Sequence, residues 1–445
     1  MEVIVTFSIF LLITLTVYFS AVYFLDNFVI SMKLSNINIV SYNFYMQLGV
    51  FCLLGSVLFI SGVVSDDTFF KETSLYSRIH AYVAIITSTI LFSLFMWIYT
   101  KLFSSLSVPR IPSSTEFDFR SMSIFLYIIV LVDILLCVYI YFGLDEIPLL
   151  ELLSGDIKKA AILRIQNAES FNGIKVIYNV FAKYYIPSVA LVLFFVCKIM
   201  SYPCKWLYRI SVILAVLFLL HDTQKAPILD FILTIILIQI SANGFKKKYL
   251  IYVLYIIIGS VLLYSFAKGI GFDQSEYLFY RVIRRIFISQ IGGLFLSFEY
   301  FPAFETFQYT LQGAPEFFLS IFGLDDVNSA KDIMLRLEGN ALELGVMNSH
   351  YMSGAWASYG YLGFVLGPLI VSLNYFLIHK LLFVYKHYLF IGIPLYFLFV
   401  VKLVFTADFK LFAFFTCLII PIIFYFGFIF AHIFSKFFYN IFKSK

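Results

Sequence analysis

The chain has 445 residues, of which 62% are hydrophobic and only 13% are charged. A soluble globular protein carries about 25% charged residues, so this chain has too few polar side chains to cover a water-soluble particle. Its 55 phenylalanines and 32 tyrosines lie in long apolar runs, which are typical of a helical protein that crosses a membrane many times. The net charge of +5 is small and indicates no nucleic-acid partner.

The sequence contains none of the common patterns for a structural metal or a cofactor. Its five cysteines lie in or beside apolar runs and form no CxxC pair, so we expect neither disulfides nor zinc. A glycine-rich phosphate loop, a nucleophile elbow and an HExxH motif are all missing. We therefore expect a protein that uses no cofactor and no metal.

A helix needs about 20 apolar residues to cross the hydrocarbon core of a bilayer. Eleven stretches come near this length, around residues 3–25, 43–64, 80–100, 122–143, 184–201, 207–221, 226–241, 249–268, 356–378, 388–405 and 411–434. No basic region precedes the first stretch, so we expect a retained span and not a removed signal peptide. The sequence predicts an all-α polytopic membrane protein in which residues 1–445 form one integral membrane domain with about eleven transmembrane helices.

The lysines and arginines of the short connections predict the orientation, because cytoplasmic loops carry an excess of them. One set of connections holds fifteen, and we place it in the cytoplasm: Lys33, Lys101, Arg110, Arg120, Lys198, Lys205, Arg209, Lys246, Lys247, Lys248, Lys380, Lys386, Lys436, Lys443 and Lys445. The opposite set holds four: Lys71, Arg78, Lys225 and Lys410. The C-terminus is then predicted to lie inside the cell and the N-terminus outside.

Two long connections fall on the predicted outer side, at residues 144–183 and 269–355. Connections of this length without linker composition usually carry a function or a structure of their own. Both contain amphipathic helical patterns, at residues 157–168 and 277–301, which we expect to lie along the membrane surface. We therefore place the chemistry of the protein on this outer face.

The strongest local signal is the run Arg281, Arg284 and Arg285 in the second long connection. On a helix, residues three and four apart share a face, so three guanidinium groups are predicted to converge there. Each can bind phosphate with two hydrogen bonds, which suits a lipid-linked pyrophosphate at the membrane interface. The alternative is contact with ordinary anionic lipid headgroups.

Two further cations lie on the predicted outer side. Arg164 is the only arginine of the first long connection. Lys225 lies in a tight hairpin between two predicted spans, next to His221 and Asp222, and could reach a phosphate in the headgroup plane. Either side chain could also be a solvated charge or a turn residue without a ligand.

His350 ends the second long connection, directly before Tyr351 and the next predicted span. A neutral imidazole at such a junction could accept the proton of a hydroxyl group, although a lone histidine is often structural. The same connection is rich in acidic residues, of which Glu338, together with Tyr351, is our candidate for binding sugar hydroxyls. The acidic spacing fits no metal-binding loop.

The whole arrangement resembles the bacterial O-antigen polymerases of the Wzy type. The resemblance covers nearly the whole chain and comprises many spans, two large outer loops, the arginine-rich helix, and a histidine before the Tyr359–Gly363 segment, Tyr-Gly-Tyr-Leu-Gly. In this family an arginine is often followed eleven residues later by a glycine. Arg281 and Gly292 have this spacing, whereas Arg164 has Gly173 instead.

The resemblance implies a GT-C-like fold and a metal-independent glycosyltransferase that polymerises undecaprenyl-pyrophosphate-linked repeat units at the periplasmic face of the bacterial inner membrane. Arg164, Lys225 and the three clustered arginines would bind the pyrophosphate, with Arg281 and Arg285 taking part in catalysis, and His350 would act as the base. The implied partners are the lipid-linked glycan donor and acceptor, membrane lipid, a chain-length regulator and a flippase.

Three other functions remain open from the sequence. One is an acyltransferase or a sensor of surface polymers, although the histidine-containing cytoplasmic motif usual in acyltransferases is missing. An O-antigen ligase would use the same chemistry with a different acceptor. A polysaccharide flippase or secondary transporter would place charges at mid-membrane, where Lys402 is the main candidate.

Overall fold

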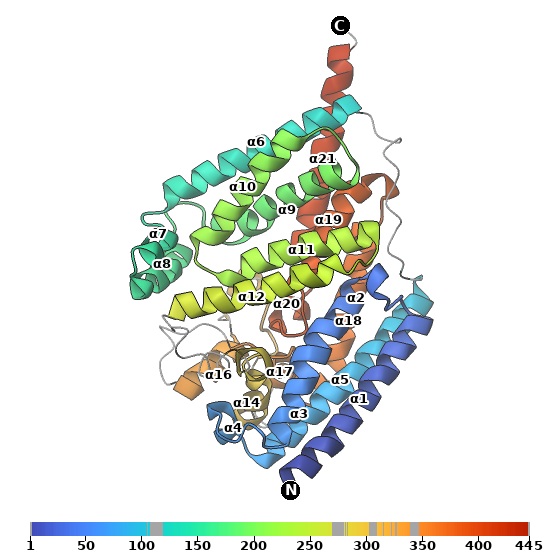
Figure 1. Ribbon diagram of the computed structural model, residues 1–445, viewed down its shortest axis with the longest axis vertical. Coiled ribbons are helices and arrows are strands. Elements are labelled where there is room, and N and C mark those ends of the chain that lie inside the picture. Colours follow the sequence, from blue (N-terminus) through green and yellow to red (C-terminus); the bar gives the residue numbers. More distant parts are fainter. Residues whose placement is uncertain are drawn as a thin grey trace. The chain divides into compact units, whose positions relative to one another are not determined.

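A computed structural model describes residues 2–104, 106, 119–268, 280, 282, 284–301, 309–314, 316–321, 323–324, 327–338 and 347–443. All regular elements in these residues are helices, as the sequence predicts (Figure 1). The chain forms two compact units. Unit 1 comprises residues 1–107, 272–380 and 403–419, and unit 2 comprises residues 108–271, 381–402 and 420–445.

Eight described helices are long and apolar enough to span a membrane, which confirms eight of the eleven predicted stretches. They are Val3–Phe28, Ile39–Ile60, Leu75–Leu102, Ser121–Gly143, Ile177–Ile199, Ala226–Asn243, Met352–Leu382 and Thr416–Ile441. The three other stretches are also helical, as α10 (Lys205–His221), α12 (Lys248–Lys268) and α19 (Leu389–Lys402). With 17 and 14 residues, α10 and α19 are short for a crossing. That α10, α12 and α19 span the membrane stays a prediction.

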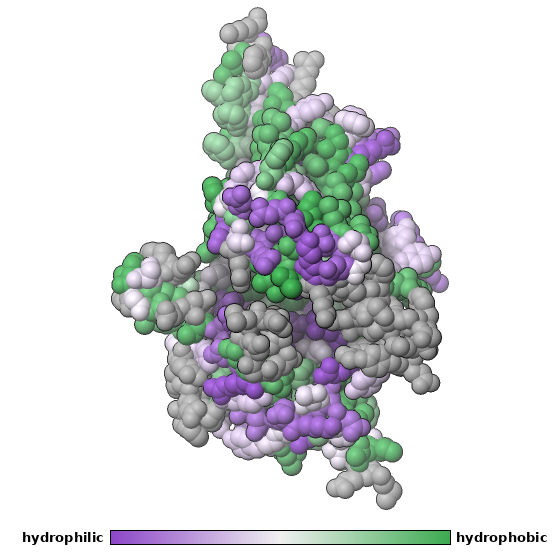
Figure 2. Space-filling view, turned by 90° about the vertical axis from the view of Figure 1, so that its left-hand side faces the viewer, coloured by the Kyte–Doolittle hydropathy of each residue, from purple (hydrophilic) through white to green (hydrophobic). Residues whose placement is uncertain are grey.

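Large apolar side chains cover much of the molecular surface, as expected for a membrane protein. Leu12 in α1 and Phe142 in α6 are 68% and 87% exposed. Figure 2 shows apolar areas beside hydrophilic areas on one face. Because monomeric soluble proteins rarely expose apolar patches this large, this surface indicates contact with lipid.

Unit 1 is built from helices of the N-terminal region and of the region after residue 271. They are α1 (Glu2–Phe28), α2 (Ile39–Tyr42), η2 (Asn43–Leu53), α3 (Leu54–Ile60), α4 (Thr68–Lys71), α5 (Leu75–Leu102), η7 (Arg284–Ile288), α14 (Gly292–Tyr300), α15 (Glu316–Ile321), α16 (Ser329–Glu338), α17 (Met352–Tyr359), η8 (Gly360–Leu362), most of α18 (Gly363–Leu382) and α20 (Lys410–Ala413). Several of these helices begin at a residue whose side chain accepts a hydrogen bond from an N–H of the first turn. The Ser74 hydroxyl, for example, accepts a hydrogen bond from the Ser77 N–H at the start of α5.

An irregular segment, residues 403–406, lies in the interior of unit 1 between α19 and α20. The Asn43 amide donates to the Leu403 carbonyl at 3.2 Å and accepts from the Phe405 N–H at 3.1 Å. The Tyr375 hydroxyl donates to the same Leu403 carbonyl at 2.7 Å, and Thr406 donates to the Gln47 side chain at 2.8 Å. Asn43 and Tyr375 thus pair backbone groups that a helix would have satisfied, and the Thr406–Gln47 hydrogen bond links the side chains of the segment and η2.

Phe405 is the centre of the aromatic core of unit 1. Its ring lies parallel to that of Tyr375, with centroids 5.7 Å apart, and 5.0 and 6.1 Å from the rings of Phe92 and Phe44. The Phe405 carbonyl accepts a hydrogen bond from the Tyr351 N–H at 2.8 Å. The irregular segment therefore positions the start of α17.

The predicted span 356–378 is interrupted. α17 ends at Gly360, whose φ of +55° favours glycine, and α18 begins at Gly363 after one short turn. A Cβ added at Gly363 would lie 2.3 Å from the Ala355 carbonyl oxygen, and one at Gly367 would lie 2.9 Å from the Ala355 Cβ. The start of α18 therefore lies in close contact with Ala355 of α17, which only the small glycine residues permit.

The predicted surface helix at 277–301 is wrong for its second half. α14 is buried from Gly292 to Phe298, with Phe295 stacked 4.1 Å from Phe59 and Phe298 stacked 4.5 Å from Trp356. Its sequence, with few charged residues and many aromatic ones, favours the interior of the protein over the headgroup layer. Much of residues 277–283 lies outside the described residues.

Unit 2 holds the remaining helices. They are α6 (Phe119–Gly143), α7 (Pro148–Leu153), α8 (Ile157–Ser170), η4 (Ile177–Ala182), α9 (Lys183–Phe194), η5 (Phe195–Ile199), α10, α11 (Lys225–Asn243), α12, η9 (Lys386–Tyr388), α19 and most of α21 (Thr416–Lys443). α8 confirms the helix expected at 157–168. Because η4 begins at Ile177, the first long connection is shorter than predicted.

The Asn43 side chain gives the first testable prediction. In Asn43→Ala, the buried Phe405 N–H loses its partner and the Leu403 carbonyl loses one of two donors, so the free energy of unfolding is expected to fall by about 2–4 kcal/mol. The exposed Asn36 of unit 1 provides the control, since Asn36→Ala should change stability by less than about 0.5 kcal/mol. Thermal unfolding in detergent measures both variants, and equal losses would contradict the role of Asn43.

Candidate functional site

Arg284 is held at the end of unit 1 where α4 lies. Its Nε donates a short hydrogen bond, within an ion pair, to the Asp67 carboxylate, and its guanidinium carbon lies 5.0 Å from the centre of the Phe69 ring. The side chain of Asp67 is 3% exposed and that of Arg284 is 26% exposed. The other Asp67 oxygen accepts from the Phe69 N–H at 2.9 Å and begins α4. Asp67 therefore joins Arg284 to α4.

Gly292 packs against the same phenylalanine. A Cβ at this position would lie 2.5 Å from the Phe69 ring. Packing therefore explains the glycine eleven residues after Arg281. Because Gly292 has no side chain, the Phe69 ring can contact both the start of α14 and the Arg284 guanidinium.

The other two clustered arginines differ from Arg284. Arg285 is exposed, on the same turn. Arg281 lies outside the described residues, so the predicted convergence of all three guanidinium groups stays a prediction. Of the described pair, Arg285 presents its side chain to the surroundings, whereas Arg284 is engaged with Asp67.

A second group of charged residues lies at the α4 end of unit 1, and the sequence did not predict that they meet there. Glu299 of α14 accepts hydrogen bonds from the Ser74 N–H at 2.8 Å and hydroxyl at 2.7 Å. Arg78 lies 3.9 Å from the centre of the Phe70 ring. Burial raises the pKa of the Glu299 carboxyl, but the hydrogen bonds from Ser74 and Ser77 and the charge of Arg78 outweigh it and lower the pKa below its usual value.

This α4 end therefore carries Arg78, Arg284 and Arg285 together with Asp67 and Glu299. For Arg78 and Glu299, the only sequence signal was the placement of Lys71 and Arg78 in an outer connection. No spacing pattern links Asp67 to Arg284, because 217 residues separate them.

His350 is buried and 1% exposed. Its Nδ1 accepts a hydrogen bond from the Met352 N–H at 3.3 Å, and its ring lies 4.3 Å from that of Tyr351 and 6.0 Å from that of Phe405. Nε2 has no hydrogen-bond partner among the residues that the structure describes. Burial lowers the pKa of His350 to about 3, so the imidazole is neutral at physiological pH and has no contact with solvent.

Binding of a glycan by Tyr351 together with Glu338 stays a prediction. Tyr351 is 1% exposed and packs in the aromatic core. Glu338 ends α16, and its side chain lies outside the described residues. Tyr351 therefore contributes to packing in this structure.

In unit 2, Arg164 lies on α8 and is partly exposed. The neighbouring Lys159 forms ion pairs with Glu146 at 2.8 Å and Glu151 at 3.2 Å, which join α8 to α7 and to the residues before it. The Asn167 amide donates to the Glu146 carbonyl at 3.1 Å. These contacts fix the helix that carries Arg164.

Lys225 begins α11, and its side chain lies outside the described residues. The hairpin before it is buried: His221 is 2% and Asp222 is 7% exposed. His221 Nε2 lies 3.0 Å from the Tyr178 hydroxyl, so the two form a hydrogen bond. The expected tight hairpin between α10 and α11 is confirmed.

Lys402, at the end of α19, belongs to a charged group in unit 2. Its ammonium lies 4.7 Å from the centre of the Tyr184 ring and interacts electrostatically with Asp230 and Lys183. The hydropathy of the sequence indicates Lys402 as a charge within an apolar stretch. It does not indicate the partners of Lys402, which are Asp230 on α11 and Lys183 on α9.

The predicted pyrophosphate ligands are therefore distributed over both units. Arg164 and Lys225 belong to unit 2, whereas Arg284 and Arg285, like the predicted base His350, belong to unit 1. A single site made by both sets stays a prediction. In the part of the chain that the structure describes, no three His, Cys, Asp or Glu residues are grouped so as to hold a metal ion.

Comparison with known proteins identifies no relative. No protein-family model, no curated protein and no solved structure matches the chain. What is established is therefore a multi-pass, all-helical membrane protein.

His350 gives a prediction on pH dependence. Because its pKa is lowered in the folded state, the unfolded chain binds the extra proton, and stability falls as the pH drops below about 6.5. From pH 6.5 to pH 5 the loss should be about 2 kcal/mol. His350→Asn, which keeps an acceptor for the Met352 N–H, should remove this part of the loss.

Thermal unfolding at several pH values measures the effect. The control is His387→Asn, at an exposed position, which should keep the pH dependence of the unaltered protein. If His350→Asn keeps it too, the buried neutral imidazole is contradicted.

Proposed function

We propose that this protein is a glycosyltransferase that polymerises lipid-linked oligosaccharide repeat units, as the Wzy-type polymerases do. The observation that carries the proposal is the arginine segment at the α4 end of unit 1. Arg284 is fixed there by Asp67 and Phe69, while the adjacent Arg285 is exposed. A guanidinium held in this way next to a membrane span suits the diphosphate of a lipid carrier.

The chemistry explains why cations are needed. Transfer of the growing glycan to the hydroxyl of an incoming unit breaks the bond between sugar and pyrophosphate, and negative charge develops on the lipid pyrophosphate. Preorganised cations stabilise this charge without rearranging. Arg281 and Arg285 would take this role, with Arg164 and Lys225 contributing from unit 2 if the two units form one site.

The wider proposal follows from the same resemblance. It includes eleven spans in a GT-C-like fold, an active site on the periplasmic side of the bacterial inner membrane, and undecaprenyl-pyrophosphate-linked donor and acceptor glycans. A flippase would supply the acceptor and a chain-length regulator would limit the product. Because Nδ1 accepts a hydrogen bond from the Met352 N–H, the proton of the neutral imidazole is on Nε2. Catalysis by His350 as a base would therefore require that the ring become exposed and that Nδ1 become free to accept the hydroxyl proton. An O-antigen ligase differs in its acceptor alone.

A secondary transporter is the second candidate function, because one candidate span is broken. Residues 360–362 separate α17 from α18, and transporters often bind substrate at such discontinuous helices. The charged group around Lys402 would suit an anion or a coupling ion.

Reconstitution of the purified protein with lipid-linked repeat units, without a flippase, separates the two candidates. The polymerase account predicts longer glycans on a gel. Arg285→Ala should lower the rate about 100-fold or more, and Arg285→Lys should keep partial activity at most, because lysine cannot bind phosphate through a planar pair of donors. Arg281→Ala should behave like Arg285→Ala.

One variant serves as a control. Arg209→Ala changes an exposed arginine of α10, on the side predicted to be cytoplasmic, and should elongate glycans normally. Arg284→Ala should also lower thermal stability, because it leaves the Asp67 carboxylate buried without its ion-pair partner. Normal elongation by both Arg281→Ala and Arg285→Ala, or lipid movement across the bilayer without elongation, would refute the polymerase.

A further inference from the structure

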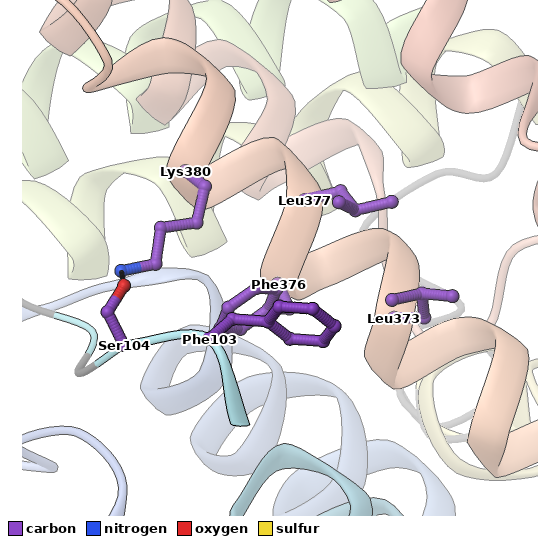
Figure 3. Close-up of a pocket in the computed structure, with 6 residues that line it drawn as sticks. All are labelled: Phe103, Ser104, Leu373, Phe376, Leu377 and Lys380. Carbon is purple, nitrogen blue, oxygen red and sulfur yellow. Dashed lines mark hydrogen bonds between the residues drawn. The ribbon is translucent and has the colours of Figure 1, made fainter. Parts of the chain in front are cut away.

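A pocket of about 160 Å³ lies between α5 and α18 in unit 1, at the end opposite to α4 (Figure 3). Its walls are mostly apolar, and it is lined by Phe103, Ser104, Leu373, Phe376, Leu377 and Lys380. This volume holds a short length of hydrocarbon chain rather than a whole ligand, since a single water takes about 30 Å³.

The pocket is held by contacts between its two helices. The Tyr99 hydroxyl of α5 donates to the Leu369 carbonyl of α18 at 3.1 Å, and the rings of Phe103 and Phe376 lie 5.8 Å apart. Both helices belong to candidate membrane spans, Leu75–Leu102 and Met352–Leu382. The pocket therefore lies at the end of two spans, where hydrocarbon meets headgroups.

The polar part of the pocket is at one end. The Lys380 ammonium donates a hydrogen bond to the Ser104 hydroxyl at 2.6 Å, and the leucines lie on the other side of the two phenylalanine rings (Figure 3). Lys101, in the last turn of α5, adds an exposed second cation to this end of the helix. Favourable charge at helix C-termini accounts for lysines here, but not for the apolar hollow beside them.

Exposed apolar residues mark the same place. Leu102 and Phe103, at the end of the candidate span Leu75–Leu102, are 70% and 66% exposed. Acyl chain in the pocket would cover Phe103, and a phosphate would meet the Lys380 ammonium and the Ser104 hydroxyl.

We propose that the α5–α18 pocket binds an anionic glycerophospholipid, with an acyl chain against Phe103, Phe376, Leu373 and Leu377 and the phosphate on Lys380. The charge complementarity between Lys380, with Lys101 nearby, and an anionic headgroup selects this occupant over a zwitterionic phospholipid. The site is independent of the proposed glycosyltransferase and lies apart from the arginines of the α4 end.

Binding of phosphatidylglycerol and of phosphatidylcholine with the same acyl chains, measured by native mass spectrometry on the delipidated full-length protein, tests the site. Phosphatidylglycerol should bind more tightly. Lys380→Gln should weaken its binding about five-fold and remove the preference, whereas Lys380→Arg should keep it. The matched control Lys205→Gln removes an exposed lysine of α10 and should leave the binding unchanged.

Equal binding of both lipids, or an equal loss in Lys380→Gln and Lys205→Gln, would overturn the proposal. A photoreactive phosphatidylglycerol with its diazirine in the acyl chain provides a test on the unaltered protein. Cross-links to Phe103, Leu373 or Leu377 support the site, and cross-links confined to other helices refute it.

Discussion

Residues 403–406 lie inside unit 1 without forming a helix, and their backbone groups must find partners in an apolar interior. Each unpaired group there would cost several kcal/mol. Asn43 and Tyr375 meet this demand for the Leu403 carbonyl and the Phe405 N–H from two other spans, and a side-chain hydrogen bond between Thr406 and Gln47 adds a further link to the segment. Phe405 is thereby fixed at the centre of the core, and its carbonyl in turn holds the start of α17 through Tyr351. The positions of His350, of α17 and of the α14 helix packed on it all depend on this one irregular segment.

At the α4 end of unit 1, a buried polar group likewise needs a partner. Asp67 is almost fully buried, so its charge needs a cation, and Arg284 supplies it. Phe69 lies under the guanidinium and against Gly292, which ties the arginine segment to α14. As a result the chain presents Arg285 from a fixed base rather than from a free loop. Preorganisation of this kind is what a cation needs in order to stabilise charge on a leaving group.

The sequence predicts the helices well and their partners poorly. Hydropathy identifies eight spans because a membrane helix satisfies its own backbone and needs only apolar length. It places α14 on the surface, because the three arginines before it dominate the pattern, whereas packing with Phe59 and Trp356 decides its burial. The Asp67–Arg284 pair joins residues 217 positions apart and has no local signature. His350 looked accessible at a loop–span junction, but the interruption at Gly360 and the segment at Phe405 place it in the core.

The account depends most directly on recognition of a diphosphate by the arginine segment. Binding of undecaprenyl pyrophosphate to the purified protein in nanodiscs, compared with undecaprenyl monophosphate and with undecaprenol, measures this recognition. The account predicts that the diphosphate binds most tightly and that Arg285→Ala removes this preference while leaving the weak binding of undecaprenol unchanged. Equal affinity for the three lipids, or an unaltered preference in the variant, would contradict it.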